Sequence, residues 1–308
     1  MRVVYKTDIE NFLPCVATVG FFDGVHAGHR YLIEELKALA LNQNLASVVI
    51  TFANHPRQVL DSNFRPDLLT SLSEKLIQLE STGIDICVVL DFTAEIANLS
   101  AYEFLKTILL EQLNVRTLLV GHDHRFGHNR ADGFPEYRNY GKLLGIEVIQ
   151  ALRFKTDEDQ LISSSEIRAA LLEGDITHAN RLLSYGYLLH GKVISGFKIG
   201  RKIGFPTANI LPEDSCKLIP ANGVYAVRVR WKSQTYKGMM NIGVRPTINN
   251  SDRISIEVHI LDFNEDIYKE TLEIDFIRKI RDEQEFKGVN ELIEQLQKDK
   301  LNVISLDY

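Results

Sequence analysis

Short apolar segments alternate with longer amphipathic segments from Cys15 to Leu183, and this alternation limits the possible folds more than any other feature of the chain. The short segments are apolar at nearly every position, which is typical of strands that are buried on both faces. The longer segments repeat their apolar residues at helical spacing. Strands and helices in this order predict an α/β domain with a parallel sheet that helices cover on both faces.

The boundaries of these elements follow from the same pattern. We expect strands at Cys15–Val19, Ala46–Phe52, Ile86–Leu90, Thr117–Val120 and Glu147–Gln150, and helices at Tyr31–Asn42, Ser73–Thr82, Ala101–Leu113, Phe134–Leu144, Ser164–Glu173 and Ile176–Leu183. Serine is a favoured residue at a helix N-terminus, so we expect Ser73 to cap the second of these helices.

The pattern changes near Ser184, where glycines begin to separate short segments with alternating polarity. In Val224–Trp231 the apolar and aromatic residues fall on one face and the arginines on the other, and Ile254–Leu261 and Leu272–Ile280 alternate similarly. This pattern predicts a small antiparallel β-barrel, which Gly288–Lys300 follows as a helix. A chain of 308 residues is long for one core, so we expect two domains, 1–183 and 184–308.

Composition restricts the classes of partner and the compartment. The net charge of −6 argues against a general nucleic-acid-binding surface. No stretch has the roughly 20 apolar residues of a membrane span, and the N-terminus lacks the apolar core of a signal peptide. Cys15, Cys87 and Cys216 lie far apart in or near apolar segments, so we expect buried, reduced thiols and a cytoplasmic protein. The oligomeric state is left open.

The turn Gly20–His29 lies between the first of these strands and its helix. A glycine-rich turn before a helix presents backbone N–H groups that favour a phosphate. His26 and His29 add side-chain donors at the same place, which suits the negative charge of a phosphoryl or nucleotidyl transfer transition state. Two purely structural histidines are the alternative reading. A zinc site is another, although no cysteine or acidic cluster nearby completes a ligand set.

Polar clusters also follow two other strands and begin a later helix, at Thr51–Pro56, Gly121–Gly127 and Ser163–Arg168. Ligands of open parallel sheets bind at the carboxyl ends of the strands, so these clusters are expected near one site. The hydroxyls and the arginine of Ser163–Arg168 suit a polyphosphate. Ordinary N-capping by serine is the alternative for that segment.

The second domain carries a distinctive run from Gly191 to Asn209. Its glycines allow a ligand to approach the backbone closely, and Pro206 fixes a bend. Thr207 and Asn209 alternate onto one side of an extended segment, where their oxygens could hold Mg²⁺ together with nucleotide phosphates. A β-turn followed by a strand with an exposed polar face is the alternative reading.

The clusters of the first domain together resemble the adenylyltransferase module of the bacterial bifunctional riboflavin kinase/FAD synthetases. The resemblance implies an α/β Rossmann-like nucleotidyltransferase domain that transfers AMP from ATP to FMN. It places the ATP phosphates in the turn Gly20–His29 and gives the two histidines catalytic roles. It places the departing pyrophosphate at Ser163–Arg168 and the flavin beside Gly121–Gly127. The matching positions are Gly20, Phe22, Asp23, Gly24, His26, Gly28 and His29 for the turn, Ser164 and Arg168 for pyrophosphate, and Asp123 and Phe126 for the flavin.

Three positions depart from the pattern of that module. The family usually has proline where Asn54 stands, an aromatic residue where His124 stands, and often threonine where Ser165 stands. The departure at His124 concerns the side of the site on which the resemblance places the flavin, whereas the residues for the phosphates are complete.

The second domain resembles the riboflavin kinase module of the same family through Gly191–Asn209, Gly223–Tyr225, Asn241–Thr247 and Glu257. This resemblance implies a six-stranded antiparallel barrel with a C-terminal helix. The implied sites are Gly191, Lys192, Gly204 and Pro206 for ATP, Thr207 and Asn209 for Mg²⁺ with ATP, Glu257 as catalytic base, and Arg281 and Glu283 for the flavin. Read without the resemblance, Glu257 on the polar face of its strand would be an ordinary solvated residue.

The two reactions require different catalysts. Riboflavin offers an alcohol, so a base such as Glu257 must take its proton as the alcohol attacks the γ-phosphate of ATP. FMN offers a phosphate with a second pKa of about 6, so this nucleophile is already ionised at pH 7 and needs no base. The site must instead offset the electrostatic repulsion between FMN and ATP. We therefore expect an enzyme that uses riboflavin, FMN and ATP with Mg²⁺. The alternatives are a monofunctional FAD synthetase with a non-catalytic flavin-binding barrel, and a flavin-sensing binding protein.

Overall fold

The computed structural model describes residues 1–9, 11–61, 63–122, 124–154, 162–196, 199–245 and 253–307. The chain packs into two compact units, the first formed by Met1–Pro66 and Lys75–Ser163 and the second by Asp67–Glu74 and Ser164–Tyr308. Within the described ranges, every helix is too short or too polar to cross a bilayer.

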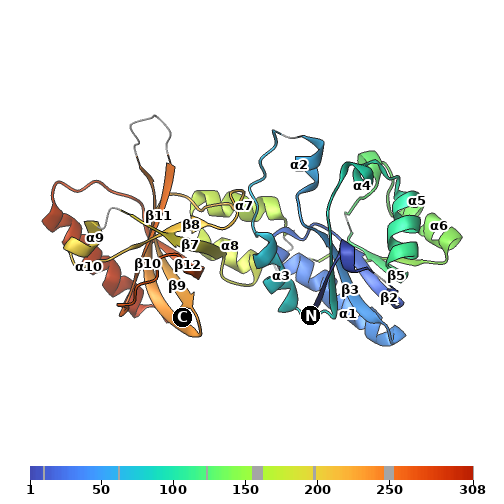
Figure 1. Cartoon of the computed structure of the whole chain (residues 1–308), viewed down its shortest axis with the longest axis horizontal. Helices are drawn as coiled ribbons and strands as arrows, with labels where there is room; N and C mark the ends of the chain where they lie inside the picture. Colours follow the sequence, from blue (N-terminus) through green and yellow to red (C-terminus); the bar gives the residue numbers. More distant parts are fainter. Residues whose placement is uncertain are drawn as a thin grey trace. The chain divides into compact units, whose positions relative to one another are not determined.

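The first unit is an α/β structure with a six-stranded parallel sheet in the order β1-β4-β3-β2-β5-β6 (Figure 1). Its strands are β1 (Arg2–Tyr5), β2 (Cys15–Val19), β3 (Ala46–Phe52), β4 (Ile86–Leu90), β5 (Val115–Val120) and β6 (Glu147–Gln150). Its helices are η1 (Lys6–Asp8), η2 (Asp23–Val25), α1 (Ala27–Gln43), α2 (Pro56–Leu60), α4 (Ala94–Asn98), α5 (Ala101–Glu103), η3 (Phe104–Gln112), η4 (His128–Arg130) and α6 (Phe134–Leu144). Helix α3 (Leu72–Glu80) contributes its residues from Lys75 onward to this unit.

The central strands are buried on both faces, as their continuous apolar sequences predict. Every residue of β2 is buried, and so are all residues of β3 after Ala46. One face of the sheet packs against α4, η3 and α6 in a single apolar cluster, and α1 packs on β2 and β3 with Ile33 and Leu36 fully buried. The predicted parallel α/β architecture is confirmed.

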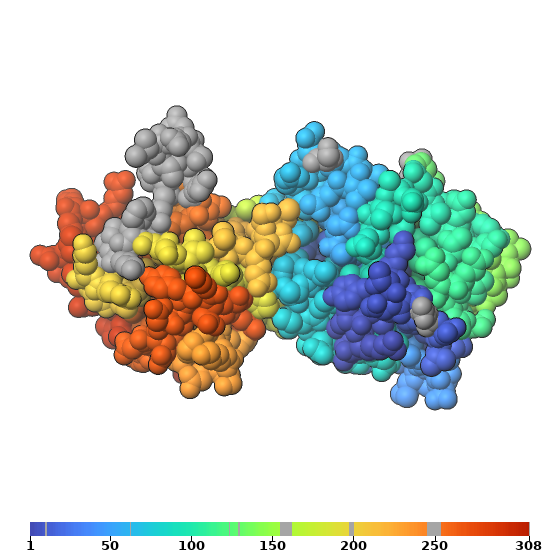
Figure 2. Space-filling view, viewed as in Figure 1, coloured from blue at the N-terminus to red at the C-terminus, as the bar shows by residue number. Residues whose placement is uncertain are grey.

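Three local features of this unit differ from the sequence-based expectation. The edge strand β1, which is short and flanked by charged residues, was not predicted; it pairs with β4, and the first residues of the chain form part of this unit's surface in Figure 2. The cap of α3 is Ser71 rather than Ser73, because Ser71 and Glu74 exchange hydrogen bonds in a capping box. The predicted helix Ala101–Leu113 is α-helical only over α5 and continues in the wider i→i+5 geometry of η3.

The three cysteines, all within the described residues, form no disulfide, and Cys15 and Cys87 are fully buried. Burial raises the pKa of the Cys15 thiol and of the Cys87 thiol to about 12. Cys216 is only half-buried, so the expectation of three buried thiols was wrong for this one.

The second unit contains a closed antiparallel barrel in the order β10-β11-β8-β7-β12-β9. Its strands are β7 (Leu188–Ile194), β8 (Ala208–Pro212), β9 (Gly223–Trp231), β10 (Gln234–Arg245), β11 (Arg253–Ile260) and β12 (Thr271–Arg281), and its helices are α7 (Ser164–Glu173), α8 (Ile176–Leu183), α9 (Ile199–Lys202) and α10 (Val289–Ser305). The predicted six-stranded barrel and C-terminal helix are confirmed. Helices α7 and α8 pack together, and α8 packs on β12 (Figure 1).

Strand β9 has the two faces that its sequence predicts. Tyr225, Val227 and Val229 are fully buried in the barrel, whereas Arg228 and Arg230 are partly exposed and pair with acidic residues of β12. Ala226, on the arginine side, is also buried, because it joins a small apolar cluster with Val303 of α10. Helix α10 therefore covers part of the outer surface of the barrel.

Candidate active sites

The turn after β2 has an unusual backbone that its glycines permit. Phe22 is left-handed with φ 53° and Gly24 has φ 79°, a combination that favours glycine at the second position. Phe22 is buried beneath the turn, and a Cβ on Gly20 would lie 2.9 Å from its ring. The side chains of Asp23 and Val25 are also buried, so the turn is held by its own packing.

The two histidines lie against each other at the start of α1. This helix begins at Ala27, four residues before the expected Tyr31, so Gly28 and His29 belong to its first turn. His26 is the N-cap, and its Nδ1 accepts a hydrogen bond from the His29 backbone N–H at 3.4 Å. The two imidazole rings are stacked with centroids 3.7 Å apart. A Cβ on Gly28 would lie 3.3 Å from the His26 ring, so glycine at this position avoids a close contact with the stacked imidazoles.

The buried surroundings keep the His29 imidazole neutral. Burial is the largest cause that holds its pKa well below the usual range, and electrostatic interactions with His26, His124 and Lys75 lower the pKa further. Among the described residues, the buried Nδ1 of His29 has no hydrogen-bond partner. His29 therefore offers a polar atom that a bound ligand could satisfy.

His124 has the same character and lies in the segment that follows β5, the strand that pairs with β2. Burial, followed by the charge of Arg130, lowers its pKa to about 4. Its Nε2 is buried, and no group in the described part of the chain hydrogen-bonds to it. The aromatic residue of the family pattern is thus replaced here by a neutral imidazole with a free nitrogen.

Asn54 has a structural explanation in this chain. Its side-chain Nδ2 donates to the Phe92 carbonyl at 2.9 Å, and its Oδ1 accepts from the Phe92 backbone N–H at 2.8 Å. The pair joins the segment after β3 to the segment after β4. A proline at this position would lack both hydrogen bonds.

The sequence analysis missed Lys75, which lies directly behind the turn. Its side chain is buried, and Nζ donates to the carbonyl oxygens of Phe21 at 3.1 Å and Phe52 at 2.9 Å. The ammonium also lies 4.2 Å from the centre of the Phe21 ring. A lysine in an amphipathic helix is normally read as a solvent-facing residue, so the sequence carried no signal for this placement.

Ser164 and Arg168 belong to the second unit, where Ser164 begins α7 as predicted. Arg168 Nε donates to the Asp67 carbonyl at 2.7 Å. Phe126 of the first unit is half-buried, and its ring stacks on Tyr137 with centroids 4.1 Å apart. Asp123 lies outside the described residues.

In the barrel, Glu257 of β11 faces the two residues expected to hold Mg²⁺. Glu257 is paired with Asn209 across β11 and β8, and Thr207 Oγ1 donates to Glu257 Oε2 at 2.9 Å. Ser255 Oγ donates to the other carboxylate oxygen at 3.3 Å. Glu257 and Asn209 are half-buried and Thr207 is exposed, so the cluster is open to solvent.

The residues around this cluster include one that the sequence did not indicate. His259 Nδ1 lies 2.8 Å from the Pro206 carbonyl oxygen, and burial lowers the pKa of this histidine. Gly204 has φ 84° in the turn before Pro206, which explains glycine there. A Cβ on Gly196 would collide with the Asn209 side chain, so this glycine lets the segment after β7 approach Asn209.

The remaining predicted residues of the barrel have their own local contacts. Gly191 lies inside β7, where a Cβ would collide with Ile210, and Lys192 is exposed beside it. Arg281 forms a bidentate pair with the fully buried Asp299 of α10, with Nη2 and Oδ2 2.8 Å apart. Glu283 packs over Gly243 of β10. Phe197, Lys198, Pro246 and Thr247 of the two characteristic runs lie outside the described residues.

Comparisons with known proteins match two family models to successive parts of the chain. A family model described as FAD synthetase matches residues 8–166, and one described as riboflavin kinase matches residues 183–306. The "bifunctional riboflavin kinase/FMN adenylyltransferase" of Bacillus subtilis is 38% identical over 94% of this chain and 91% of its own. The protein of the same name from Listeria monocytogenes is 40% identical over 97% of this chain and 96% of its own. A crystal structure described as a macrolide-efflux protein from Streptococcus pneumoniae superposes over the full length of both chains with a TM-score of 0.90 and 31% identity.

Proposed function

The chain belongs to the family of bifunctional riboflavin kinase/FMN adenylyltransferases, and we propose that it converts riboflavin to FMN and FMN to FAD at two separate sites. We assign the adenylylation of FMN to residues 1–183 and the phosphorylation of riboflavin to residues 184–308. The observation that carries this proposal is the contrast in catalytic groups. One site has stacked histidines and the other has a carboxylate held by hydroxyl groups.

In the kinase reaction, Glu257 accepts the proton of the attacking riboflavin hydroxyl. An alcohol is a poor nucleophile at neutral pH, so a positioned carboxylate accelerates its attack on the γ-phosphate. The hydrogen bonds from Thr207 and Ser255 fix the two carboxylate oxygens before the substrate arrives. The exposure of Thr207 leaves this group within reach of a ligand.

The oxygen donors around Glu257 fit a magnesium ion. The Thr207 hydroxyl and the Asn209 amide oxygen, both beside Glu257, are hard ligands of the kind that Mg²⁺ prefers. Thr207 and Asn209 would hold the ion together with ATP, and it would neutralise part of the charge on the transferred phosphate. We assign Gly191, Lys192, Gly204 and Pro206 to the surroundings of the same nucleotide.

In the adenylyl transfer, the turn Gly20–His29 holds the ATP phosphates while FMN attacks the α-phosphate. The FMN phosphate is mostly dianionic at pH 7, so the site must offset repulsion rather than remove a proton. The N-terminus of α1 and the imidazole nitrogens of His26 and His29 provide hydrogen bonds for that purpose. Because the His29 ring is neutral, it donates one hydrogen bond without a charge of its own.

The other site residues follow the family pattern and are part of this proposal. We assign Ser164 and Arg168 to the departing pyrophosphate, and Asp123 and Phe126 to FMN. Arg281 and Glu283 are assigned to riboflavin. The ion pair with Asp299 gives Arg281 a structural role as well, because it fixes β12 to α10. The free thiols of Cys15 and Cys87 suit a reducing compartment, so we place the enzyme in the cytoplasm.

Chromatography of the products tests the proposed function directly. Purified protein with riboflavin, ATP and Mg²⁺ is expected to form FMN first and then FAD. FAD formed only from added FMN would show a monofunctional synthetase with a binding barrel. Retention of flavin without turnover would show a flavin-sensing protein.

A further inference from the structure

We propose that Lys75 is a positioning residue for adenylyl transfer, because its ammonium joins the phosphate turn to the end of β3 and keeps a positive charge behind the site. This inference rests on the proposed FAD-forming reaction of the first unit. Lys75 is only 2% exposed, so it acts through the turn rather than by touching a substrate.

The hydrogen bonds of Lys75 reach two neighbouring strand ends. Phe21 follows β2 and begins the phosphate turn, and Phe52 is the last residue of β3. Strands β2 and β3 are adjacent and parallel, so both carbonyl groups lie at the ligand-binding edge of the sheet. Thr51 Oγ1 also donates to the Phe21 carbonyl, at 3.1 Å. The peptide between Phe21 and Phe22 is therefore held by two side-chain donors, one of which is charged.

The charge on Lys75 is costly to bury, and its hydrogen bonds to the described residues go to neutral carbonyl groups. Within the described residues, its ammonium makes neither an ion pair nor a hydrogen bond with a carboxylate. Burial lowers its pKa to about 8, although Asp23 and Cys87 favour the charged form. A methionine would fill the same space without this cost, so packing alone does not explain a lysine.

The charge of Lys75 acts electrostatically on His29. Lys75 is among the groups that lower the pKa of His29, which places its field at the imidazole expected to meet the phosphates. Positive charge fixed in a poorly solvated place stabilises developing negative charge more than a mobile, solvated one does. The ammonium contacts the carbonyls of Phe21 and Phe52 and the Phe21 ring. The titratable groups that interact with its charge are Asp23, Cys87 and His29.

Two variants of Lys75 test the inference. Lys75→Met is expected to lower kcat for FAD formation by about 10²-fold, because the turn loses its charged support. The same protein should phosphorylate riboflavin at the wild-type rate, and its thermal midpoint should not fall. Wild-type kcat for FAD formation in a folded Lys75→Met protein would overturn the proposal.

Lys75→Arg keeps the charge but removes its titration near neutral pH. In the wild type, kcat/KM for ATP in FAD formation is expected to fall above about pH 8, as Lys75 loses its proton. The guanidinium stays protonated, so the arginine variant should lack this alkaline decline. A decline that persists unchanged in Lys75→Arg would overturn the proposal even if the methionine variant failed to fold. A wild-type protein that forms no FAD would instead refute the proposed function.

Discussion

In the proposed function, the phosphate turn of the first unit (Gly20–His29) and the Glu257 cluster of the second unit promote phosphate chemistry by opposite means. The turn combines a helix N-terminus with two stacked imidazoles, and the buried Nδ1 of His29 has no hydrogen-bond partner among the described residues. The Glu257 cluster combines a carboxylate with hydroxyl and amide groups on adjacent strands. The difference follows from the nucleophile, because a phosphate is already ionised at neutral pH whereas an alcohol must lose its proton.

Two buried lysines repeat this contrast. Lys217 of the second unit is 2% exposed at its side chain and lies 2.7 Å from the equally buried carboxylate of Glu74. Its charge is neutralised, and its Nζ also donates to the Leu69 carbonyl. Lys75 of the first unit donates to backbone carbonyls instead. We therefore expect Lys217 to act on stability and Lys75 to act on the rate of one reaction.

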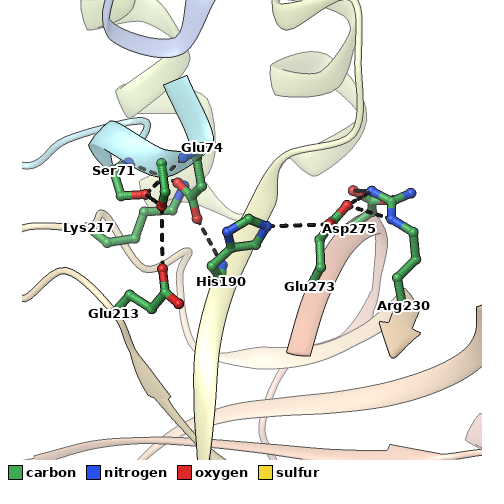
Figure 3. Close-up of polar contacts among 9 residues, drawn as sticks. Ser71, Glu74, His190, Glu213, Lys217, Arg230, Glu273 and Asp275 are labelled. Atoms are coloured by element: carbon green, nitrogen blue, oxygen red, sulfur yellow. Dashed lines mark hydrogen bonds and ion pairs between the residues drawn. The ribbon is translucent and has the colours of Figure 1, made fainter. Parts of the chain in front are cut away.

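Figure 3 shows that Glu74 is the centre of the polar network in the second unit. Its carboxylate accepts from Lys217 Nζ at 2.7 Å, from the Ser71 backbone N–H at 2.9 Å and from the His190 backbone N–H at 2.8 Å. From the same helix, Ser73 Oγ donates a hydrogen bond to the Glu213 carboxylate at 3.3 Å. This network explains why the segment Asp67–Glu74 packs with the barrel rather than with the rest of α3.

The largest effect on stability is expected for Glu74→Ala. Removing one partner of a buried ion pair leaves the other charge uncompensated, so the free energy of unfolding should fall by about 3–5 kcal/mol. Denaturant unfolding of the whole protein measures this change. The double variant Glu74→Leu/Lys217→Met is the matched control and should recover most of the loss. A fall of the same size in Lys75→Met would show that the two lysines do not differ as described.

The largest effect on FAD formation is expected for His29→Ala. Loss of one positioned donor in an anion-stabilising site typically lowers kcat by about 10²–10³-fold. FMN formation from riboflavin should be unchanged, because the kinase groups lie on the barrel. The exposed His128 offers a control in the same unit, and His128→Ala should leave both rates near the wild type. An equal loss of both activities in His29→Ala would contradict two independent sites.

A smaller, pH-dependent effect is expected at His190 of β7. Burial lowers its pKa, but the carboxylates of Glu273, Glu74 and Glu213 outweigh burial and raise it overall. Its Nε2 lies 3.5 Å from Glu273 Oε2. Figure 3 shows the ring directed toward that carboxylate. A histidine with a raised pKa contributes stability below its unfolded pKa, and this contribution is lost as the pH rises through the folded value.

The thermal midpoint should therefore decrease from pH 6 toward pH 9 more in the wild type than in His190→Gln. The pair is partly exposed on the Glu273 side, so the difference should amount to about 0.5–1 kcal/mol. Identical pH dependence of the two proteins would show that His190 is not charged in the folded state.

The sequence predicted what local patterns determine. Strands β2, β3, β4 and β6 have the predicted ends, because their apolar residues are bounded by polar or turn residues. The turn before α1 was predicted because glycines and histidines concentrate there. In the barrel, the alternation in β9 indicated the buried face correctly.

Features that depend on distant contacts were not predictable. Lys75 and Lys217 are buried by elements far from them in the sequence, and nothing in their neighbourhoods distinguishes them from surface lysines. Strand β1 has four residues and owes its burial to pairing with β4. The choice of Ser71 over Ser73 as cap depends on Glu74, whose second partner, Lys217, comes 143 residues later. The role of Asn54 likewise depends on a distant contact, because its side chain hydrogen-bonds to the Phe92 backbone in the segment after β4.

The variant Glu257→Gln tests most directly that the two reactions use separate catalysts. Its amide keeps the size of the side chain and loses the base. With riboflavin and ATP, FMN formation should fall by about 10²–10⁴-fold. With FMN supplied, the same preparation should form FAD at the wild-type rate. Loss of FAD formation from supplied FMN in a folded protein, or wild-type FMN formation from riboflavin, would contradict the account.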